Sequence, residues 1–109
     1  MAYDEGLAQR IREVLADDRR IREKKMFGGL AFLVDGNMCC GVVNDELMLR
    51  VGPDAYAEAL ALPFAREMDF TGRPLKGMVY VGTEGFESDE DLKGWIDRGL
   101  TFAGSLPAK

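Results

Sequence analysis

The middle of the chain holds three short apolar runs in succession, and no other feature restricts the possible folds as strongly. Residues 30–34 (LAFLV), 38–43 (MCCGVV) and 46–51 (ELMLRV) are rich in residues that favour strands and are too short for independent helices. The DGN and ND sequences between them are typical of tight turns. The pattern therefore predicts an antiparallel meander of three strands.

Three amphipathic segments flank this meander and are predicted to be helices. Apolar side chains recur at three- and four-residue steps in residues 4–17, in residues 56–61 and again after Ser88. Ser88 and Asp91 come close to a capping box, and three acids in the first turn suit the positive end of a helix dipole. The last helix is therefore predicted to begin directly after Ser88.

Two more strands, at residues 66–70 and 78–81, complete the predicted β content. Residues 17–25 (DDRRIREKK) carry a single apolar side chain, so we predict that they link the first helix to the meander. Because the strands come as hairpins instead of alternating with helices, the fold class is α+β. The expected structure has two layers, an antiparallel sheet with helices packed on one side, in the order α-βββ-α-ββ-α. No linker divides the chain, so a single domain is predicted over residues 1–109.

The composition argues against several classes of function. The chain has no histidine, which removes Ser-His and Cys-His catalytic arrangements and histidine-based zinc sites. Two cysteines are too few for a zinc site made of four thiolates. Nineteen acidic against fourteen basic residues give a net charge of −5, which opposes broad attachment to nucleic acid. We therefore expect no enzymatic activity, no metal or cofactor and no direct binding of nucleic acid.

The sequence also favours a cytoplasmic location. No apolar run approaches the ~20 residues that a membrane-spanning helix needs. The first residues, MAYDEGLAQR, carry acids and lack the apolar core of a secretion signal. We expect no contact with a membrane.

The KKMFGG sequence at residues 24–29 invites comparison with a phosphate-binding loop. Such a loop leads into a helix and usually places a lysine or a hydroxyl residue after its glycines. Here the lysines precede the glycines, and a predicted strand follows them. The sequence favours a bulge or sharp bend that uses the conformational freedom of Gly28 and Gly29.

Cys39 and Cys40 are neighbours in a predicted strand. Their side chains are therefore expected on opposite faces of the sheet, one in the core and one facing out. A disulfide between adjacent residues would be strained, so thiols acting as small apolar side chains are the favoured interpretation. A redox-sensing role for the exposed thiol stays open as an alternative. The internal methionines are likewise interpreted mainly as core-filling side chains.

Two groups of charged residues have alternative interpretations. The first group comprises Arg19, Arg20, Arg22, Lys24 and Lys25. We interpret it as a solvated turn, because Glu23 and two preceding aspartates compensate part of its charge. The second surrounds the TGRP turn and comprises Arg66, Asp69, Arg73 and Lys76. This second group fits an anion-binding site and a turn held by surface ion pairs equally well.

Four segments and the closing amphipathic helix together resemble the TfoX (Sxy) N-terminal domain family. The segments are MAYDEGLAQRIRE, KKMFGGLAFLVDGNM, DELMLRVGPDAY and MDFTGRPLKGMVYV. The resemblance extends over nearly the whole chain and implies a two-layer α+β fold. Full-length TfoX proteins are bacterial regulators of competence that act with the cyclic-AMP receptor protein and carry a second, C-terminal domain. This chain is similar to the stand-alone members, and the resemblance lends it no catalytic residues.

The leading hypothesis is a non-enzymatic regulatory domain of the bacterial cytoplasm that acts by protein–protein contact. The resemblance implies the transcription machinery or the cyclic-AMP receptor protein as partners, and a homodimer would cover an open sheet face or edge. The alternative is a small-ligand or anion-binding module that uses Arg50, Arg73 and Lys76. The candidate surface for either function comprises Met26, Phe27, Gly28, Gly29, Arg50, Arg73 and Lys76.

Overall fold

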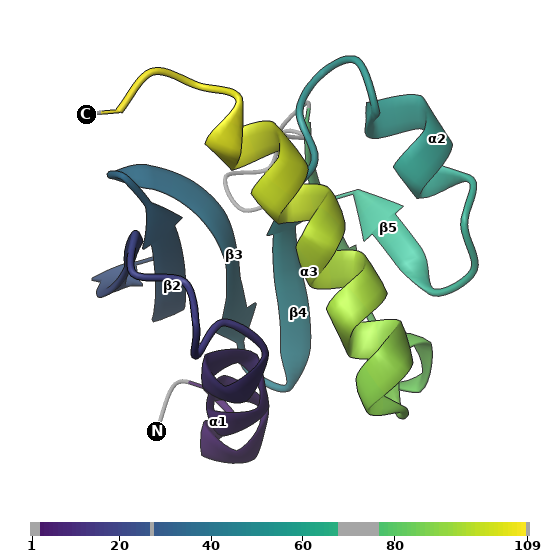
Figure 1. The fold of residues 1–109 in the computed structure, drawn as a ribbon. Coiled ribbons are helices and arrows are strands. Elements are labelled where there is room, and N and C mark those ends of the chain that lie inside the picture. The colour runs from purple at the N-terminus through teal and green to yellow at the C-terminus, as the bar shows by residue number, and fades with distance from the viewer. Residues whose placement is uncertain (1–2, 27, 68–76, 109) are drawn as a thin grey trace.

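A computed structural model describes residues 3–26, 28–67 and 77–108 of the chain. Its elements in chain order are α1 (Glu5–Val14), β1 (Ile21–Met26), β2 (Gly29–Val34), β3 (Asn37–Val43), β4 (Glu46–Arg50), α2 (Tyr56–Leu60), β5 (Ala65–Glu67), β6 (Met78–Val81), the 3-10 helix η1 (Thr83–Phe86) and α3 (Asp89–Gly104). The strands form one six-stranded antiparallel sheet in the order β1-β2-β3-β4-β6-β5 (Figure 1). The predicted α+β fold class is confirmed.

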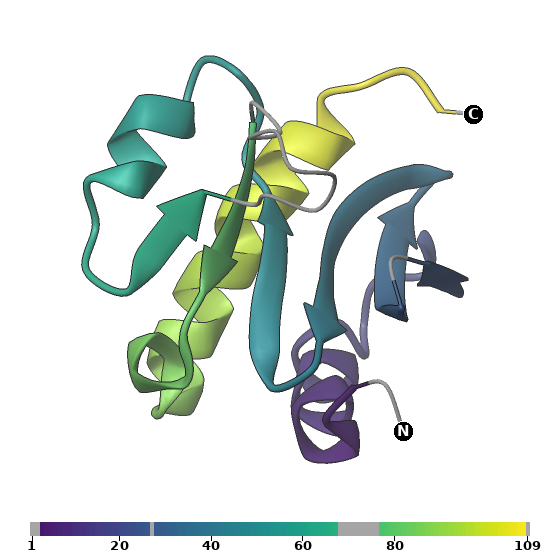
Figure 2. The same cartoon turned by 180° about the vertical axis from the view of Figure 1, so that it is seen from behind.

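The helices and the sheet form two layers. In Figure 1, α3 runs diagonally in front of the sheet between β4 and β5, with α1 at the lower left, and the view from behind in Figure 2 places the strands in front of α3. Ile11 of α1, Phe32 of β2 and Ile96 of α3 are almost completely excluded from solvent in one shared core. Burying large apolar side chains of this kind contributes roughly 1.5–3 kcal/mol each. None of the helices in the described parts of the chain has the length and apolar character needed to cross a membrane.

Both long helices begin at the residues that the sequence indicates. The Ser88 hydroxyl accepts a hydrogen bond from the Asp91 backbone N–H at 3.0 Å, and the Asp4 carboxylate accepts one from the Gly6 N–H at 2.8 Å. These side chains satisfy backbone donors that have no partner inside the helix. α3 therefore starts after Ser88, as predicted.

The charged segment before the meander forms a strand, and the prediction that it is only a link is wrong. β1 pairs with β2 along its whole length, from Ile21 opposite Val34 to Met26 opposite Gly29. Among the described side chains of β1, only Ile21 packs against the core, while residues 22–25 are exposed. An outermost strand needs neither apolar alternation nor a buried face, because its backbone hydrogen bonds to one neighbour hold it in place. The observed order is α-ββββ-α-ββ-α.

The prediction that Cys39 and Cys40 face opposite sides of the sheet is also wrong. Cys40 lies opposite Phe32 and Met38 lies opposite Leu33, so Cys39 is an extra residue in a β-bulge. A bulge interrupts the alternation of side chains and bends the strand, and β3 is visibly curved in Figure 1. Both cysteines are completely buried in the core beneath the helices.

Neither thiol is therefore expected to react in the folded protein. A hydrogen bond with Cys39 and burial raise the pKa of the Cys40 thiol, so its reactive thiolate form is disfavoured. Ellman's reagent at neutral pH should detect no thiol in the native domain and both thiols in guanidinium chloride. Rapid reaction of one thiol under native conditions would restore the redox-sensing alternative.

A second, smaller apolar cluster lies apart from this core on the sheet. Ala31, Met38 and Met48 are buried there, on strands β2, β3 and β4. The interpretation of the methionines as core-filling side chains therefore fits Met38 and Met48. The side chain of Met26 and the whole of Met68 lie outside the described residues.

Candidate interaction surface

The structure places three of the predicted surface residues and leaves the others undescribed. Gly28 and Gly29 lie at the turn between β1 and β2, and Arg50 is the last residue of β4. For Met26, only the side chain lies outside the described residues. Three further members lie outside them entirely: Phe27, Arg73 and Lys76. The predicted convergence of Arg50 with two other basic side chains therefore stays a prediction.

The two glycines of KKMFGG have different structural roles. Gly28 has φ +74°, a conformation that L-residues rarely adopt, and no described atom lies within 4 Å of the place where its Cβ would be. Gly29 sits where β2 approaches β3, and a Cβ there would collide with the carbonyl oxygen of Val42. The pair thus makes a tight hairpin followed by a close strand contact, which is the bend that the sequence favours.

Arg50 lies beside a groove between the end of β4 and α3. Its guanidinium carbon is 5.1 Å from the centroid of the Phe102 ring, within the range of a cation–π contact. Phe102 is one wall of a groove of about 340 Å³, which is lined by Val51, Asp54, Ala55, Arg98, Thr101, Phe102 and Ser105. The groove is mainly apolar and carries one charge of each sign, because Asp54 and Arg98 stand on its rim.

The open edge of β1 is the second surface, and sequence reasoning missed it because it missed the strand. β1 is the first strand of the sheet order, so β2 is its only neighbour among the described strands. Glu23 is the single acid of β1, and Arg12 of α1 donates two hydrogen bonds to its carboxylate, at 2.9 and 3.0 Å. The pKa of Arg12 is raised above its ordinary value, chiefly by this contact. Glu23 therefore compensates a helix residue instead of its neighbours on the strand.

The basic side chains of this edge have no acidic partner in the described parts of the chain. Six of the described basic residues take part in ion pairs: Arg10, Arg12, Arg20, Arg66, Lys93 and Arg98. The described basic residues outside these pairs are Arg19, Arg22, Lys24, Lys25 and Arg50. All of them except Arg50 lie on β1 or in the turn before it.

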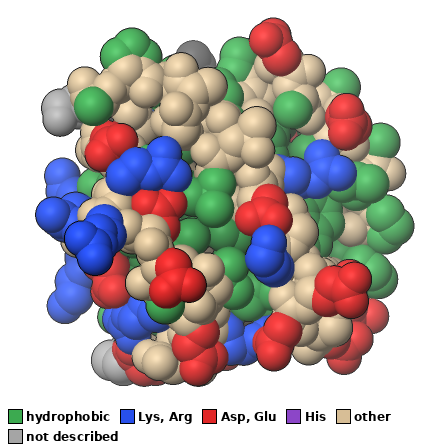
Figure 3. Space-filling view, in the orientation of Figure 1, with side chains coloured by type: hydrophobic (Ala, Val, Ile, Leu, Met, Phe, Trp, Pro, Cys, Tyr) green, Lys and Arg blue, Asp and Glu red, His purple; other side chains and the backbone are tan. Residues whose placement is uncertain are grey.

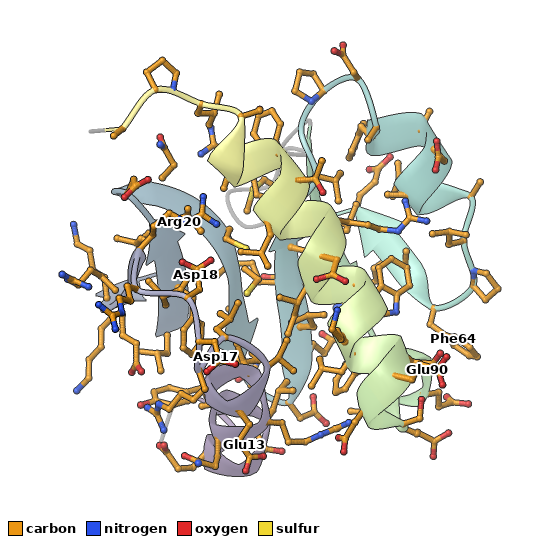
Figure 4. The ribbon with its side chains drawn as sticks, viewed as in Figure 1. Glu13, Asp17, Asp18, Arg20, Phe64 and Glu90 are labelled. Carbon is orange, nitrogen blue, oxygen red and sulfur yellow. The ribbon has the colours of Figure 1, made fainter. Side chains whose placement is uncertain are left out.

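The figures show the same separation of charge. Lys and Arg side chains gather along the left edge of Figure 3, beside β2 in the same orientation as Figure 1, and Asp and Glu gather at the lower right. In Figure 4 Arg20 lies next to Asp18, to which it donates a hydrogen bond of 2.8 Å. That contact lowers the pKa of Asp18. The predicted compensation of the basic run is thus local to Arg20 and does not extend along β1.

The fold and this surface define a small α+β domain with a basic open strand edge. The sequence model of the TfoX N-terminal domain family matches residues 13–103, so the chain belongs to this family. No curated protein matches the chain. Within the described residues, no group of three or more Cys, Asp or Glu side chains is placed to hold a metal ion.

Proposed function

We propose that this domain is a non-enzymatic regulatory domain that acts in the bacterial cytoplasm by binding a protein partner at the open edge of β1. Family membership supports a regulatory role, since full-length TfoX proteins regulate competence. By the same resemblance, the partner belongs to the transcription machinery or is the cyclic-AMP receptor protein. The absence of histidine is consistent with binding instead of catalysis.

The observation that carries the proposal is the group of unpaired cations on an exposed strand edge. The chain has a net charge of −5, yet Arg22, Lys24 and Lys25 are exposed and form no ion pair with a described carboxylate. An outermost strand also presents backbone donors and acceptors that a partner can use. Charge of this kind on a surface speeds association with a partner of opposite charge.

Site-specific photo-crosslinking in the source cell tests the proposal. A photo-reactive amino acid in place of Lys25 should give a discrete adduct with another protein. The same residue in place of Glu90, at the far side of the molecule from β1 (Figure 4), should not give that adduct. Identical adducts from the Lys25 and Glu90 positions would contradict protein binding at this edge. So would the lack of a discrete adduct when the photo-reactive residue replaces Lys25 and when it replaces Arg22.

The groove beside Arg50 supports a second candidate function, the binding of a small anion. The guanidinium of Arg50 stacks on Phe102, which lines the groove, so an anion bound beside this ring would combine a nearby positive charge with apolar contacts. A small aromatic carboxylate or phosphate that binds should raise the melting temperature in proportion to the logarithm of its concentration. Arg50→Gln should abolish that rise, and Lys93→Gln on the exposed face of α3 should leave it unchanged. A rise of equal size in both variants would exclude Arg50.

A further inference from the structure

We propose that the partner contributes an extended acidic segment, which adds to β1 as a further antiparallel or parallel strand of the sheet. This inference rests on the proposed function and names the chemistry of the partner at the same edge.

The backbone of alternate β1 residues is directed away from β2. The Asp35 N–H donates to the Arg20 carbonyl at 3.2 Å, which makes these two residues a hydrogen-bonded pair of the ladder. In an antiparallel ladder such pairs alternate with non-bonded ones, so Arg22 and Lys24 bond to β2 while Glu23 and Lys25 do not. The N–H and C=O groups of Glu23 and Lys25 are therefore directed to the open edge. They match the spacing with which another strand would bond.

The carbonyl of Ile21 marks where this free stretch begins. It also belongs to the outward set, and the Arg22 guanidinium donates to it at 3.0 Å. That contact covers the edge at the start of β1 and leaves the outward backbone groups of Glu23 and Lys25 available. An added strand of a few residues would therefore centre on Lys24.

The charges of β1 lie on both faces of the strand. Ile21 packs on the helix side of the sheet, and Glu23 pairs with Arg12 of α1. Because side chains alternate along a strand, Arg22 and Lys24 lie on the opposite face. An added strand would place two of its side chains, two positions apart, beside Arg22 and Lys24. Acidic residues at those positions, and one beside Lys25 on the other face, would make favourable cross-strand pairs.

A second copy of this strand is a poor occupant of the same edge. Antiparallel pairing of β1 with itself has a two-fold axis at Arg22, Glu23 or Lys24. These registers place Arg22 opposite Arg22, Arg22 opposite Lys24, or Lys24 opposite Lys24. The last register also places Glu23 opposite Lys25, but Glu23 is already paired with Arg12. Like charges directly opposite each other destabilise a strand pair.

Nucleic acid also fits the edge less well than an acidic peptide. Binding to a phosphate backbone relies on many cations, and the net charge of −5 opposes it. A nucleic acid would leave the outward backbone groups of Glu23 and Lys25 without the regular partners that a peptide strand provides. An acidic peptide strand would pair with the cations of β1 and would also form hydrogen bonds with the outward backbone groups of Glu23 and Lys25.

Peptide binding by fluorescence anisotropy tests the inference on the purified domain. A labelled peptide that alternates glutamate with valine should bind at low ionic strength, and a peptide with lysine in place of glutamate should not. Methylation of alternate backbone nitrogens in the glutamate peptide removes its strand donors but keeps its charge, and should abolish binding. Equal binding of the methylated peptide would overturn strand addition, as would the lack of any binding by the glutamate peptide.

Protein variants locate the site. Replacing Arg22 and Lys24 together by glutamate should weaken binding about tenfold or more, since two attractive pairs become repulsive. Lys25→Thr should change it little, because the peptide that places its glutamates beside Arg22 and Lys24 places valine beside Lys25. Lys25→Pro should abolish it, because proline also removes the outward N–H. Circular dichroism should show that both Lys25 variants are folded, and unchanged affinity in the folded Lys25→Pro variant would overturn the inference.

Further outcomes separate this inference from the proposed function. If Lys25 crosslinks to a discrete protein in the cell but acidic peptides do not bind, the proposed function stands and strand addition is wrong. If acidic peptides bind but the cell gives no adduct, the edge chemistry is right and the proposed function is wrong. A double-stranded oligonucleotide that binds more tightly than the peptide, or a dimer that the Arg22 and Lys24 double variant dissociates, would also overturn the acidic strand.

Discussion

Gly29→Ala is expected to lower the free energy of unfolding by about 3 kcal/mol or more. The new methyl group would collide with the carbonyl oxygen of Val42, and two hydrogen-bonded strands would have to separate to admit it. The contact is with backbone, so no rotation of a flexible side chain can relieve it. Urea denaturation followed by the fluorescence of Trp95 measures the loss.

Gly28→Asn is the matched control for this prediction. Gly28 has positive φ but an open environment, and asparagine is among the residues that tolerate this conformation best. The variant should lose no more than about 1 kcal/mol. Equal losses in the two variants would show that the hairpin conformation, and not the close approach of β2 and β3, explains the double glycine.

Gly99→Ala is expected to destabilise the domain by about 2 kcal/mol, although alanine is the better helix former. A Cβ at Gly99 would lie 2.6 Å from the Cys39 carbonyl oxygen and 3.0 Å from a methyl carbon of Leu49. α3 would have to move away from the bulge of β3. The melting temperature, measured by circular dichroism, should fall.

Gly94→Ala in the same helix should have the opposite effect. No described atom lies within 4 Å of the position of its Cβ, and Gly94 is exposed. Alanine should therefore stabilise α3 by up to about 1 kcal/mol through helix propensity alone. A gain in stability for Gly99→Ala as well would contradict the close packing of α3 on Cys39.

The sequence predicted those elements whose formation depends on local patterns. The DGN turn lies between two runs of apolar residues, and Ser88 lies before an amphipathic segment; both signals are sufficient because the contacts they describe are within the same few residues. The family resemblance is confirmed by the match over residues 13–103. The strand pattern that follows KKMFGG, where a phosphate-binding loop would lead into a helix, predicts the bend at this motif.

Two features depend on contacts that the local pattern does not contain. β1 has almost no apolar side chains, because an outermost strand is held by its backbone and by Arg12 of α1. One sequence feature is consistent with β1. The segments on either side of the turn at Gly28, residues 21–26 and 29–34, have equal length, as the two strands of a hairpin do. The bulge at Cys39 follows from the register of β3 against β2 and from the packing of Gly99, neither of which the sequence of β3 specifies.

The candidate surface was predictable only in part for the same reason. The unusual KKMFGG motif is a local signal that identifies Gly28 and Gly29 from the sequence. For the basic edge the sequence indicates a compensated turn, since Glu23 stands between Arg22 and Lys24. Only the three-dimensional structure shows that Glu23 forms an ion pair with Arg12. This pairing leaves the basic side chains of the edge without a compensating carboxylate on their own strand.

Residue-resolved amide hydrogen exchange tests the central claim, that β1 is an open strand edge which accepts an acidic strand. In the free domain the amides of Arg22 and Lys24 should be protected, and those of Glu23 and Lys25 should exchange rapidly. With the glutamate peptide bound, Glu23 and Lys25 should become protected as well, while Arg22 and Lys24 stay as they were. Unchanged rapid exchange at Glu23 and Lys25 in the complex would contradict the account.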